Sequence, residues 1–267
     1  MFLLKENETI EDLQIDGYRL IQSLNGHRFG EDSVLLANHA ASFFVNRKKK
    51  YAIYDLGCGC GAVSFLLAGK LVNSSITGVE IQEYPYSVYI RNILLNDLSH
   101  RVSGLNYDWN TLTGKTFKGV ADIVVSNPPY FKIESGPTAS DDSRAIARSF
   151  KKGSETELAR AASYLLKSGG MCFIVYRSAR LPDMLLALRE FDLEPVNIRF
   201  VHAYAGSAPK TFLVSSRKSG KPGGLIVDKP LVIFDSNGVY SEQLKEYYGK
   251  SSPMTKDELY RGITKNE

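Results

Sequence analysis

One short segment constrains the fold more than any other part of this sequence. The apolar run at residues 51–54 (YAIY) is typical of a buried strand, and it leads into a glycine-rich turn at residues 55–62 (DLGCGCGA). Glycines at alternate positions let the backbone turn tightly and approach a ligand closely, because no Cβ intervenes. Residues 62–71 then have the pattern of a helix. A strand, a glycine turn and a helix in this order predict an α/β fold with a ligand at the turn.

The rest of the sequence alternates predicted strands and helices in the same way. Helices are predicted at residues 32–44, 86–95, 155–166 and 181–191, strands at 75–80, 102–107, 121–126, 171–176, 196–202 and 211–215, and a hairpin at 225–234. Such alternation indicates a mostly parallel, twisted sheet with helices on both faces, and ligands of such sheets bind beyond the carboxyl ends of the strands. We therefore predict a Rossmann-like α/β fold with an antiparallel C-terminal hairpin.

Composition is that of an ordinary globular protein. Hydrophobic residues make up 43% of the chain and charged residues 23%. The apolar runs are too short to span a bilayer, and the acidic start does not resemble a signal peptide. Three cysteines argue against a disulfide framework, so we expect a cytoplasmic protein. The net charge of +4 is compatible with a nucleic-acid substrate.

The acid that precedes the first glycine indicates which ligand the turn holds. A G-x-G-x-x-G dinucleotide pattern would tolerate Ala62 at its last position, so the glycines alone leave a nicotinamide cofactor open. A carboxylate at Asp55, however, would repel a pyrophosphate. The same carboxylate suits the ammonium and sulfonium charges of S-adenosylmethionine, which we predict as the cofactor.

Acids at the ends of the next two strands fit the same cofactor. Glu80 follows Asp55 by 25 residues, and its carboxylate can accept two hydrogen bonds from a ribose diol. Asp108, flanked by Tyr107 and Trp109, can accept a hydrogen bond from an adenine amine, while an apolar neighbour such as Ile81 covers the ring. Asp97 and Asn106 compete with Asp108 for this role.

The cysteines of the turn do not indicate a metal. Cys58 and Cys60 have no further cysteine nearby, and the four histidines of the chain are scattered, so a four-ligand zinc site is not expected. Small side chains that fill a tight turn are the better interpretation, and no metal is predicted.

A second motif, Asn127-Pro128-Pro129-Tyr130, ends the fourth predicted strand. Two prolines alone would indicate only a turn. An aromatic amine or amide is a poor nucleophile because its lone pair is delocalised, and acceptors aimed at its N–H groups make it more nucleophilic. The Asn127 side-chain oxygen and the Pro128 carbonyl are such acceptors, held in place by the prolines. Tyr130 and Phe131 can stack on a flat base. The motif therefore predicts methylation of a planar nitrogen.

Together these motifs resemble the class I methyltransferases that act on amino groups, and within them the tRNA(Val) adenine-N6 methyltransferase family. Further segments carry the resemblance over most of the chain, at residues 18–23 (YRLIQS), 32–37 (DSVLLA) and 78–83 (GVEIQE) and at Arg177, Arg180 and Tyr240. That family methylates the adenine 3′ of the anticodon. The sequence departs from it at Ser149-Phe150 and at residues 204–210, where substrate contacts are expected.

The resemblance and the motifs together assign candidate residues. Phe29 and Asp32 are implied to line the cofactor pocket, and Asn127 to Tyr130 to position the amine. The expected cofactor-binding residues are Phe29, Asp32, Asp55, Gly57, Gly59, Gly61, Glu80, Ile81, Asp108, Trp109 and Asn127. The expected substrate-binding residues are Tyr130, Phe131, Arg144, Arg148, Lys151, Lys152 and Lys210, of which the basic ones would contact tRNA phosphates.

We expect one methyltransferase domain over residues 1–267, with an N-terminal extension (1–46), a catalytic core (47–217) and a C-terminal appendage (218–267). A monomer is favoured. Three other readings remain open: a protein glutamine-N5 methyltransferase, an rRNA or DNA amino-methyltransferase, and a non-catalytic scaffold, which the intact motifs argue against.

Overall fold

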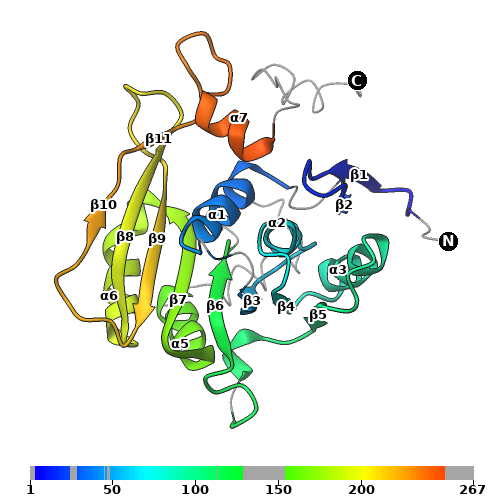
Figure 1. Ribbon diagram of the computed structural model, residues 1–267, viewed down its shortest axis with the longest axis horizontal. Helices are drawn as coiled ribbons and strands as arrows, with labels where there is room; N and C mark the ends of the chain where they lie inside the picture. The colour runs from blue at the N-terminus through cyan, green and yellow to red at the C-terminus, as the bar shows by residue number, and fades with distance from the viewer. Residues whose placement is uncertain are drawn as a thin grey trace, which may run out of the picture.

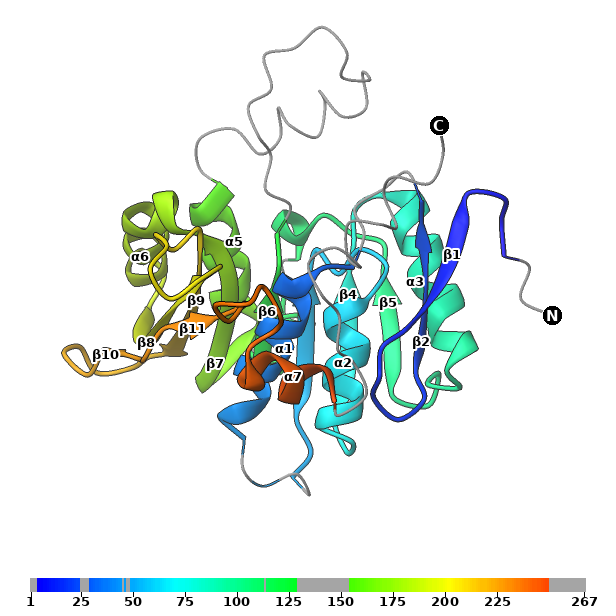
Figure 2. The ribbon, with the colours of Figure 1, turned by 90° about the horizontal axis from the view of Figure 1, so that it is seen from above.

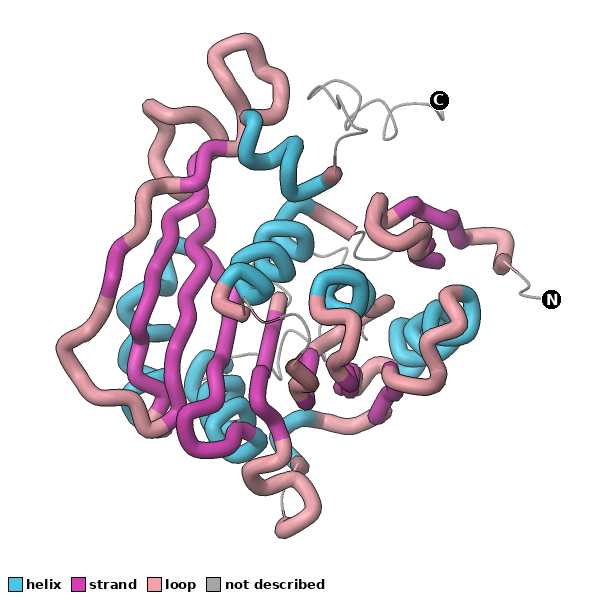
Figure 3. The backbone as a smooth tube through the Cα atoms, viewed as in Figure 1, coloured by secondary structure: helices cyan, strands magenta, loops and turns pink. Residues whose placement is uncertain are grey.

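A twisted sheet with helices on both faces forms the centre of the molecule (Figures 1 and 3). The computed structural model describes residues 4–24, 29–44, 46, 49–112, 114–128 and 154–249. The sheet has the strand order β10-β8-β9-β7-β6-β3-β4-β5, and β11 also pairs with β8. Its strands are β3 (Ala52–Leu56), β4 (Ser75–Val79), β5 (Val102–Leu105), β6 (Ala121–Ser126), β7 (Leu166–Arg177), β8 (Leu193–His202), β9 (Thr211–Lys218), β10 (Ile226–Val227) and β11 (Leu231–Val232).

The five strands from β3 to β7 are parallel, and β9 pairs antiparallel with both β7 and β8. The predicted mostly parallel sheet is therefore confirmed, and its antiparallel C-terminal pair is formed by β8 and β9. The direction in which successive strands are added reverses at β3, with β4 and β5 on one side of β3 and β6 and β7 on the other. A ligand crevice is expected at this switch point, beyond the carboxyl ends of β3 and β6.

The helices divide between the two faces of the sheet (Figure 2). Helices α1 (Glu31–Ser42), α2 (Ala62–Lys70) and α3 (Glu83–Leu95) cover one face, and α5 (Ser154–Leu165) and α6 (Leu181–Glu190) cover the other. Side chains alternate along β6, so that Ile123 and Val125 pack with α1 and α2 while Val124 packs with α5. Burial on both faces explains why these strands are continuously apolar. Each predicted core helix and strand is present, with ends shifted by a few residues.

A hairpin that the sequence did not predict precedes the core. Strands β1 (Glu8–Asp12) and β2 (Arg19–Ser23) pair antiparallel as a separate two-stranded sheet. The hairpin lies beside α3, at the far side of the molecule from β8 (Figure 2). Its turn uses positive φ angles at Gln14, Asp16 and Gly17.

The predicted hairpin at residues 225–234 is wrong. Its two segments, β10 and β11, do not pair with each other, because each adds in parallel to the edge of β8. Strands of two residues carry too few cross-strand pairs to hold a hairpin of their own, so the neighbouring edge sets their direction. Tyr240 follows, and its hydroxyl donates to Oε1 of Glu31 at 3.0 Å. The chain then continues into α7 (Glu242–Tyr248), which contacts α1.

Candidate functional site

The glycine turn between β3 and α2 is a compact loop fixed by its backbone. Gly57, Gly59 and Gly61 have φ angles of +72°, +55° and +99°, in the region that favours glycine. The N–H groups of Gly57 and Cys58 donate to the carbonyl of Val79 at 2.8 and 3.1 Å. The loop is thereby held against the end of β4, the neighbouring strand.

The three glycines of this loop face different surroundings. A Cβ at Gly61 would lie 2.4 Å from the ring of Phe65 and 2.5 Å from that of Tyr89, and one at Gly57 would lie 2.9 Å from Trp109. A Cβ at Gly59 would meet nothing within 4 Å. Two glycines therefore permit close internal packing, whereas Gly59 presents bare backbone to open space.

Glu80 connects this loop to the end of β4. Its side chain is buried, with Oε2 accepting a hydrogen bond from Gly59 N at 3.0 Å and Oε1 one from Gln82 N at 2.9 Å. Burial raises the pKa of this carboxyl, and the backbone N–H groups of Gln82 and Gly59 oppose the shift. Each oxygen has a second lone pair with which to accept a ligand hydroxyl.

Asp55 lies inside the protein beneath the loop. It is 1% exposed, and its Oδ2 accepts a hydrogen bond from Ser64 Oγ at 2.7 Å. Burial raises the pKa of Asp55 to about 7, with the Ser64 hydrogen bonds acting in the opposite direction. The carboxyl thus faces the first turn of α2, and a sequence reading could not have identified Ser64 as its partner.

The end of β5 supplies the third side of the site. Asp108 begins a short 3₁₀ turn (Trp109–Thr111) by accepting a hydrogen bond from Asn110 N at 2.8 Å. Asn106, named as a competitor of Asp108, donates instead to the carbonyls of Glu80 and Ile81 at 2.8 and 3.2 Å. Trp109 is buried under Gly57, whereas Ile81 is 56% exposed and offers an apolar surface beside the loop.

Asn127 follows β6, the strand next to β3. Its Nδ2 donates to Ser33 Oγ in the first turn of α1 at 3.2 Å. The preceding Ser126 donates through Oγ to the carbonyl of Leu56 at 2.7 Å, which ties the end of β6 to the start of the glycine loop. Pro128 is buried. The motif and the loop, 70 residues apart, therefore lie side by side.

The amino-terminal candidates reach the site through α1. Phe29 packs against the core, and its N–H donates to Oε1 of Gln22 in β2 at 2.7 Å. Asp32 lies in the first turn of α1, one residue before Ser33. The start of α1 therefore contacts Asn127 through Ser33.

Of the expected substrate-binding residues, the structure describes Lys210. It is exposed at the start of β9, and its carbonyl accepts a hydrogen bond from Ser178 N at 3.0 Å. Because β9 runs antiparallel to β7, Lys210 lies at the same edge of the sheet as Asn127. The other predicted residues lie outside the described part of the chain, namely Pro129, Tyr130, Phe131, Arg144, Arg148, Lys151 and Lys152.

The cysteines of the loop are free thiols, Cys58 buried and Cys60 partly buried. Burial raises the pKa of Cys58 and raises that of Cys60 to about 11. Within the described ranges, no three histidine, cysteine, aspartate or glutamate side chains are grouped as a metal site would require. The neutral thiols act as small apolar groups in the turn.

A comparison with protein families decides the class of this site. Residues 31–191 match the model of the methyltransferase small domain. The chain belongs to this methyltransferase family. The matched segment contains the glycine loop, Glu80 and Asn127, so the residues gathered at the strand ends lie within the part that the family shares.

Sequence relatives of this methyltransferase include enzymes that carry more specific names. A tRNA1(Val) (adenine(37)-N6)-methyltransferase of Flavobacteriaceae bacterium (strain 3519-10) is 31% identical over 150 residues, which cover 55% of this chain and 59% of that relative. The Haemophilus influenzae protein of the same name is 27% identical over 239 residues, which cover 87% of this chain and 96% of the relative. A release factor glutamine methyltransferase of Fusobacterium nucleatum is 39% identical over 87 residues, 32% of this chain and 23% of the relative.

Solved structures confirm the class I methyltransferase fold. A predicted O-methyltransferase of Agrobacterium tumefaciens superposes with a TM-score of 0.64 at 22% identity and covers 81% of this chain and 95% of its own. A 16S rRNA N2 methyltransferase of T. thermophilus, solved with AdoMet and guanosine, has a TM-score of 0.56 at 18% identity and covers 81% of this chain and 52% of its own. In this methyltransferase, none of the helices that the structure describes combines the length and the apolarity needed to cross a membrane.

Proposed function

We propose that this methyltransferase transfers the methyl group of S-adenosylmethionine to the exocyclic amine of adenine in RNA, at N6 of the tRNA(Val) adenine 3′ of the anticodon. The observation that carries the proposal is the meeting of the glycine loop and Asn127 at the ends of adjacent strands β3 and β6. The name of the Haemophilus influenzae relative, aligned over 87% of this chain, supports the choice of nucleotide.

The described residues fit S-adenosylmethionine in charge and in shape. Gly59 leaves open space for a close backbone approach, and Glu80 keeps lone pairs for a ribose diol. Ile81 offers exposed apolar surface beside the loop for the adenine ring. The carboxyl of Glu80 borders the loop and that of Asp55 lies buried beneath it, which supports a cofactor with ammonium and sulfonium charges. When bound, the cofactor supplies a methyl group activated by the positive sulfur.

Asn127 would orient and activate the acceptor nitrogen. Its Nδ2 end donates to Ser33, and we propose that its Oδ1 end accepts an N–H from the target amine. An amine held by Asn127 would take the methyl group that the cofactor supplies, with the sulfur leaving with the electron pair of the carbon–sulfur bond, and the proton of the amine would pass to solvent water. Most of the acceleration would come from positioning. The target base must be unpaired, or flipped out of a duplex, for its amine to reach Asn127.

The remaining substrate contacts are proposed from the sequence. Stacking on the base by Tyr130 and Phe131 and phosphate contacts by Arg144, Arg148, Lys151 and Lys152 concern residues outside the described ranges. Lys210 supports this arrangement, because it is exposed at the same sheet edge as Asn127. We further propose one domain over residues 1–267, because α1 of the predicted extension and Tyr240 of the appendage pack in the same core as β3.

Methylation of a protein glutamine is the second candidate. The amide nitrogen of glutamine has the same delocalised lone pair, and the release factor glutamine methyltransferase of Fusobacterium nucleatum is 39% identical over 87 residues. Its alignment covers 32% of this chain, which is why we rank it below the adenine substrate.

A transfer assay separates these candidates. The purified chain is incubated with S-adenosylmethionine labelled in the methyl group and with tRNA, rRNA, DNA or protein from a strain that lacks the gene. We expect label in tRNA, recovered as N6-methyladenosine after digestion to nucleosides. Label in protein alone would favour glutamine as the substrate, and label in rRNA or DNA alone would show that the methylated amine belongs to that nucleic acid instead of tRNA. No label with any substrate would favour a non-catalytic scaffold.

A further inference from the structure

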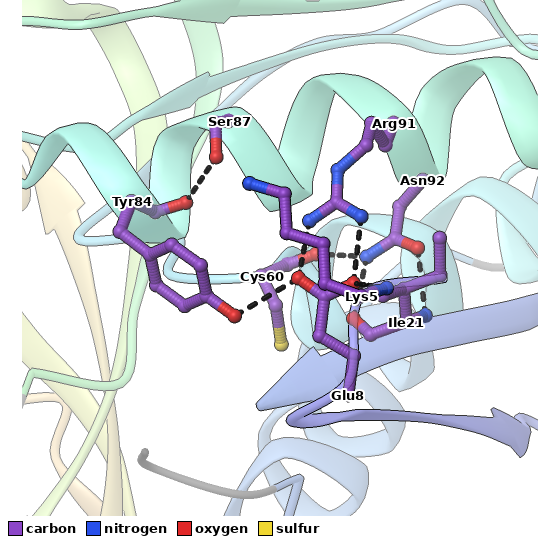
Figure 4. Close-up of polar contacts among 8 residues, drawn as sticks. All are labelled: Lys5, Glu8, Ile21, Cys60, Tyr84, Ser87, Arg91 and Asn92. Carbon is purple, nitrogen blue, oxygen red and sulfur yellow. Dashed lines mark hydrogen bonds and ion pairs between the residues drawn. The ribbon is translucent and has the colours of Figure 1, made fainter. Parts of the chain in front are cut away.

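The amino-terminal hairpin is attached to α3 by polar side chains (Figure 4). Glu8 of β1 is buried and accepts hydrogen bonds from Arg91 Nη1 at 2.7 Å and from Tyr84 Oη at 2.9 Å. Pairing with Arg91 lowers the pKa of Glu8 to about 2, so the carboxylate is ionised throughout the physiological range. The hairpin is therefore docked by directed bonds, which specify one position.

Asn92 of α3 and Asn96, which caps the end of that helix, bond to β2 in the way a neighbouring strand would. Asn92 accepts from Ile21 N at 2.7 Å and donates to Ile21 O at 2.9 Å, and Asn96 does the same for Arg19 at 2.7 and 2.8 Å. The asparagines are four residues apart on a helix, about 6 Å, and their partners two apart on a strand, about 6.7 Å. The two spacings match, so each side-chain amide satisfies one backbone N–H and one carbonyl of β2.

Asn92 has one contact that Asn96 lacks. Its Nδ2 also donates to the carbonyl of Cys60 at 2.9 Å, between Gly59 and Gly61 in the glycine loop (Figure 4). Asn92 is fully buried, and its three hydrogen bonds use both of its N–H groups and its oxygen. A single amide thus connects the hairpin to the loop proposed to hold the cofactor.

The hairpin also reaches the other side of the site. Gln22, the residue after Ile21, is buried and accepts a hydrogen bond from Phe29 N at 2.7 Å, just before α1 begins. Asn127 in turn donates to Ser33 in the first turn of α1. Strand β2 is therefore bonded to the glycine loop through Asn92 and to the entry of α1 through Gln22.

We propose that Asn92 is a positioning residue that sets the glycine loop for cofactor binding and couples that loop to the docked hairpin. This inference rests on the proposed cofactor site. Because coupling between two parts of a protein is reciprocal, cofactor binding stabilises the docked hairpin to the same extent that docking strengthens cofactor binding. The hairpin then belongs to the working site, although none of its side chains need touch the cofactor.

Asn96→Ala provides a matched control for Asn92→Ala. Both variants lose the amide pairing to β2. Asn96→Ala also loses the bond from Nδ2 to the carbonyl of Asn92 at 2.8 Å, whereas only Asn92→Ala loses the bond to Cys60 in the glycine loop. With both proteins folded, we expect calorimetry to give a dissociation constant for S-adenosylmethionine about ten-fold higher for Asn92→Ala than for Asn96→Ala, the scale of one buried hydrogen bond. The KM for tRNA should be alike in the two. Equal cofactor affinity in the two variants would overturn the proposal.

Hydrogen exchange on the unmodified chain tests the coupling without any variant. Adding S-adenosylmethionine should slow the exchange of the β1–β2 amides. In a separate measurement, Glu8→Gln, which removes the charge paired with Arg91 and so weakens hairpin docking, should raise the cofactor dissociation constant. Unchanged exchange in β1–β2 on cofactor binding would refute the coupling. Failure of the unmodified chain to bind S-adenosylmethionine would instead remove the proposed function itself, so the two failures are distinguishable.

Discussion

The two strand ends that meet at the site are shaped by different parts of the chain. The turn after β3 is shaped within residues 57–61 by glycine φ angles and by bonds to the adjacent β4. The amide after β6 is oriented by Ser33, 94 residues earlier in the sequence. Among the contacts of the described residues, the shape of the first strand end depends mainly on local backbone geometry, and the orientation of the second on the distant hydroxyl of Ser33. Substitutions at the first should cost stability, whereas substitutions at the second should cost rate.

Gly61→Ala should have the largest effect on stability. Its Cβ would meet the fully buried rings of Phe65 and Tyr89 at 2.4 and 2.5 Å, in a backbone conformation that alanine disfavours. Overpacking and strain together should lower the free energy of unfolding by about 2–4 kcal/mol. Urea denaturation measures the loss, with Gly206→Ala as the control, since a Cβ there meets nothing within 4 Å. Equal midpoints for the two variants would show that the loop is not tightly packed.

Asp55→Asn should remove a pH dependence of stability. The pKa of Asp55 in the folded chain is about 7, above its ordinary 3.8. The folded state therefore holds this proton more tightly than the unfolded state, and the contribution of Asp55 to stability falls as pH rises from about 4 to 7. The slope is about 1.4 kcal/mol per pH unit in that window. Urea denaturation from pH 5 to 8 should show the unmodified chain losing stability relative to the variant up to about pH 7. Parallel curves of unfolding free energy against pH for the two proteins would contradict the raised pKa of Asp55.

Gly59→Ala distinguishes the open glycine from the packed ones. Because nothing lies within 4 Å of its Cβ, the cost should be only the left-handed backbone strain, about 1 kcal/mol. A cofactor that approaches the bare backbone should nevertheless bind more weakly, and calorimetry with S-adenosylmethionine measures this. Unchanged affinity would mean that the ligand does not approach the loop at Gly59.

Ser33→Ala should have the smallest effect. It removes the acceptor of Asn127 Nδ2 without a change in packing volume, so we expect less than about 1 kcal/mol of lost stability and a several-fold lower rate of methyl transfer. Cofactor affinity should stay the same. A rate equal to that of the unmodified chain would show that Asn127 is held by other contacts.

The sequence predicted those parts of the molecule that depend on local pattern. The parallel strands are recognisable because they are buried on both faces, as Ile123, Val124 and Val125 illustrate, and the glycine loop because its turn needs glycine itself. The distant partners carry no such signal. Ser33, Ser64 and Asn92 are ordinary helix residues until the fold brings Asn127, Asp55 and Cys60 to them.

The β1–β2 hairpin and the segment at residues 225–234 show the limit of predicting strand pairing from sequence. Strand β1 has the acidic sequence ETIED, which gives no apolar alternation, and Arg91 and Tyr84 of α3 hold it in place. Residues 225–234 do look like a hairpin, but β8 offers an edge to each segment separately. In both cases contacts distant in sequence decide the pairing, so sequence pattern alone predicted neither.

The single-turnover rate of methyl transfer by Asn127→Ala at saturating S-adenosylmethionine tests the central claim most directly. If the Asn127 oxygen acts on the amine during transfer, the rate should fall by about 10²–10³-fold, the usual effect of one lost transition-state hydrogen bond. The cofactor dissociation constant should change little. A rate close to that of the unmodified chain, or a loss explained entirely by weaker cofactor binding, would contradict the account.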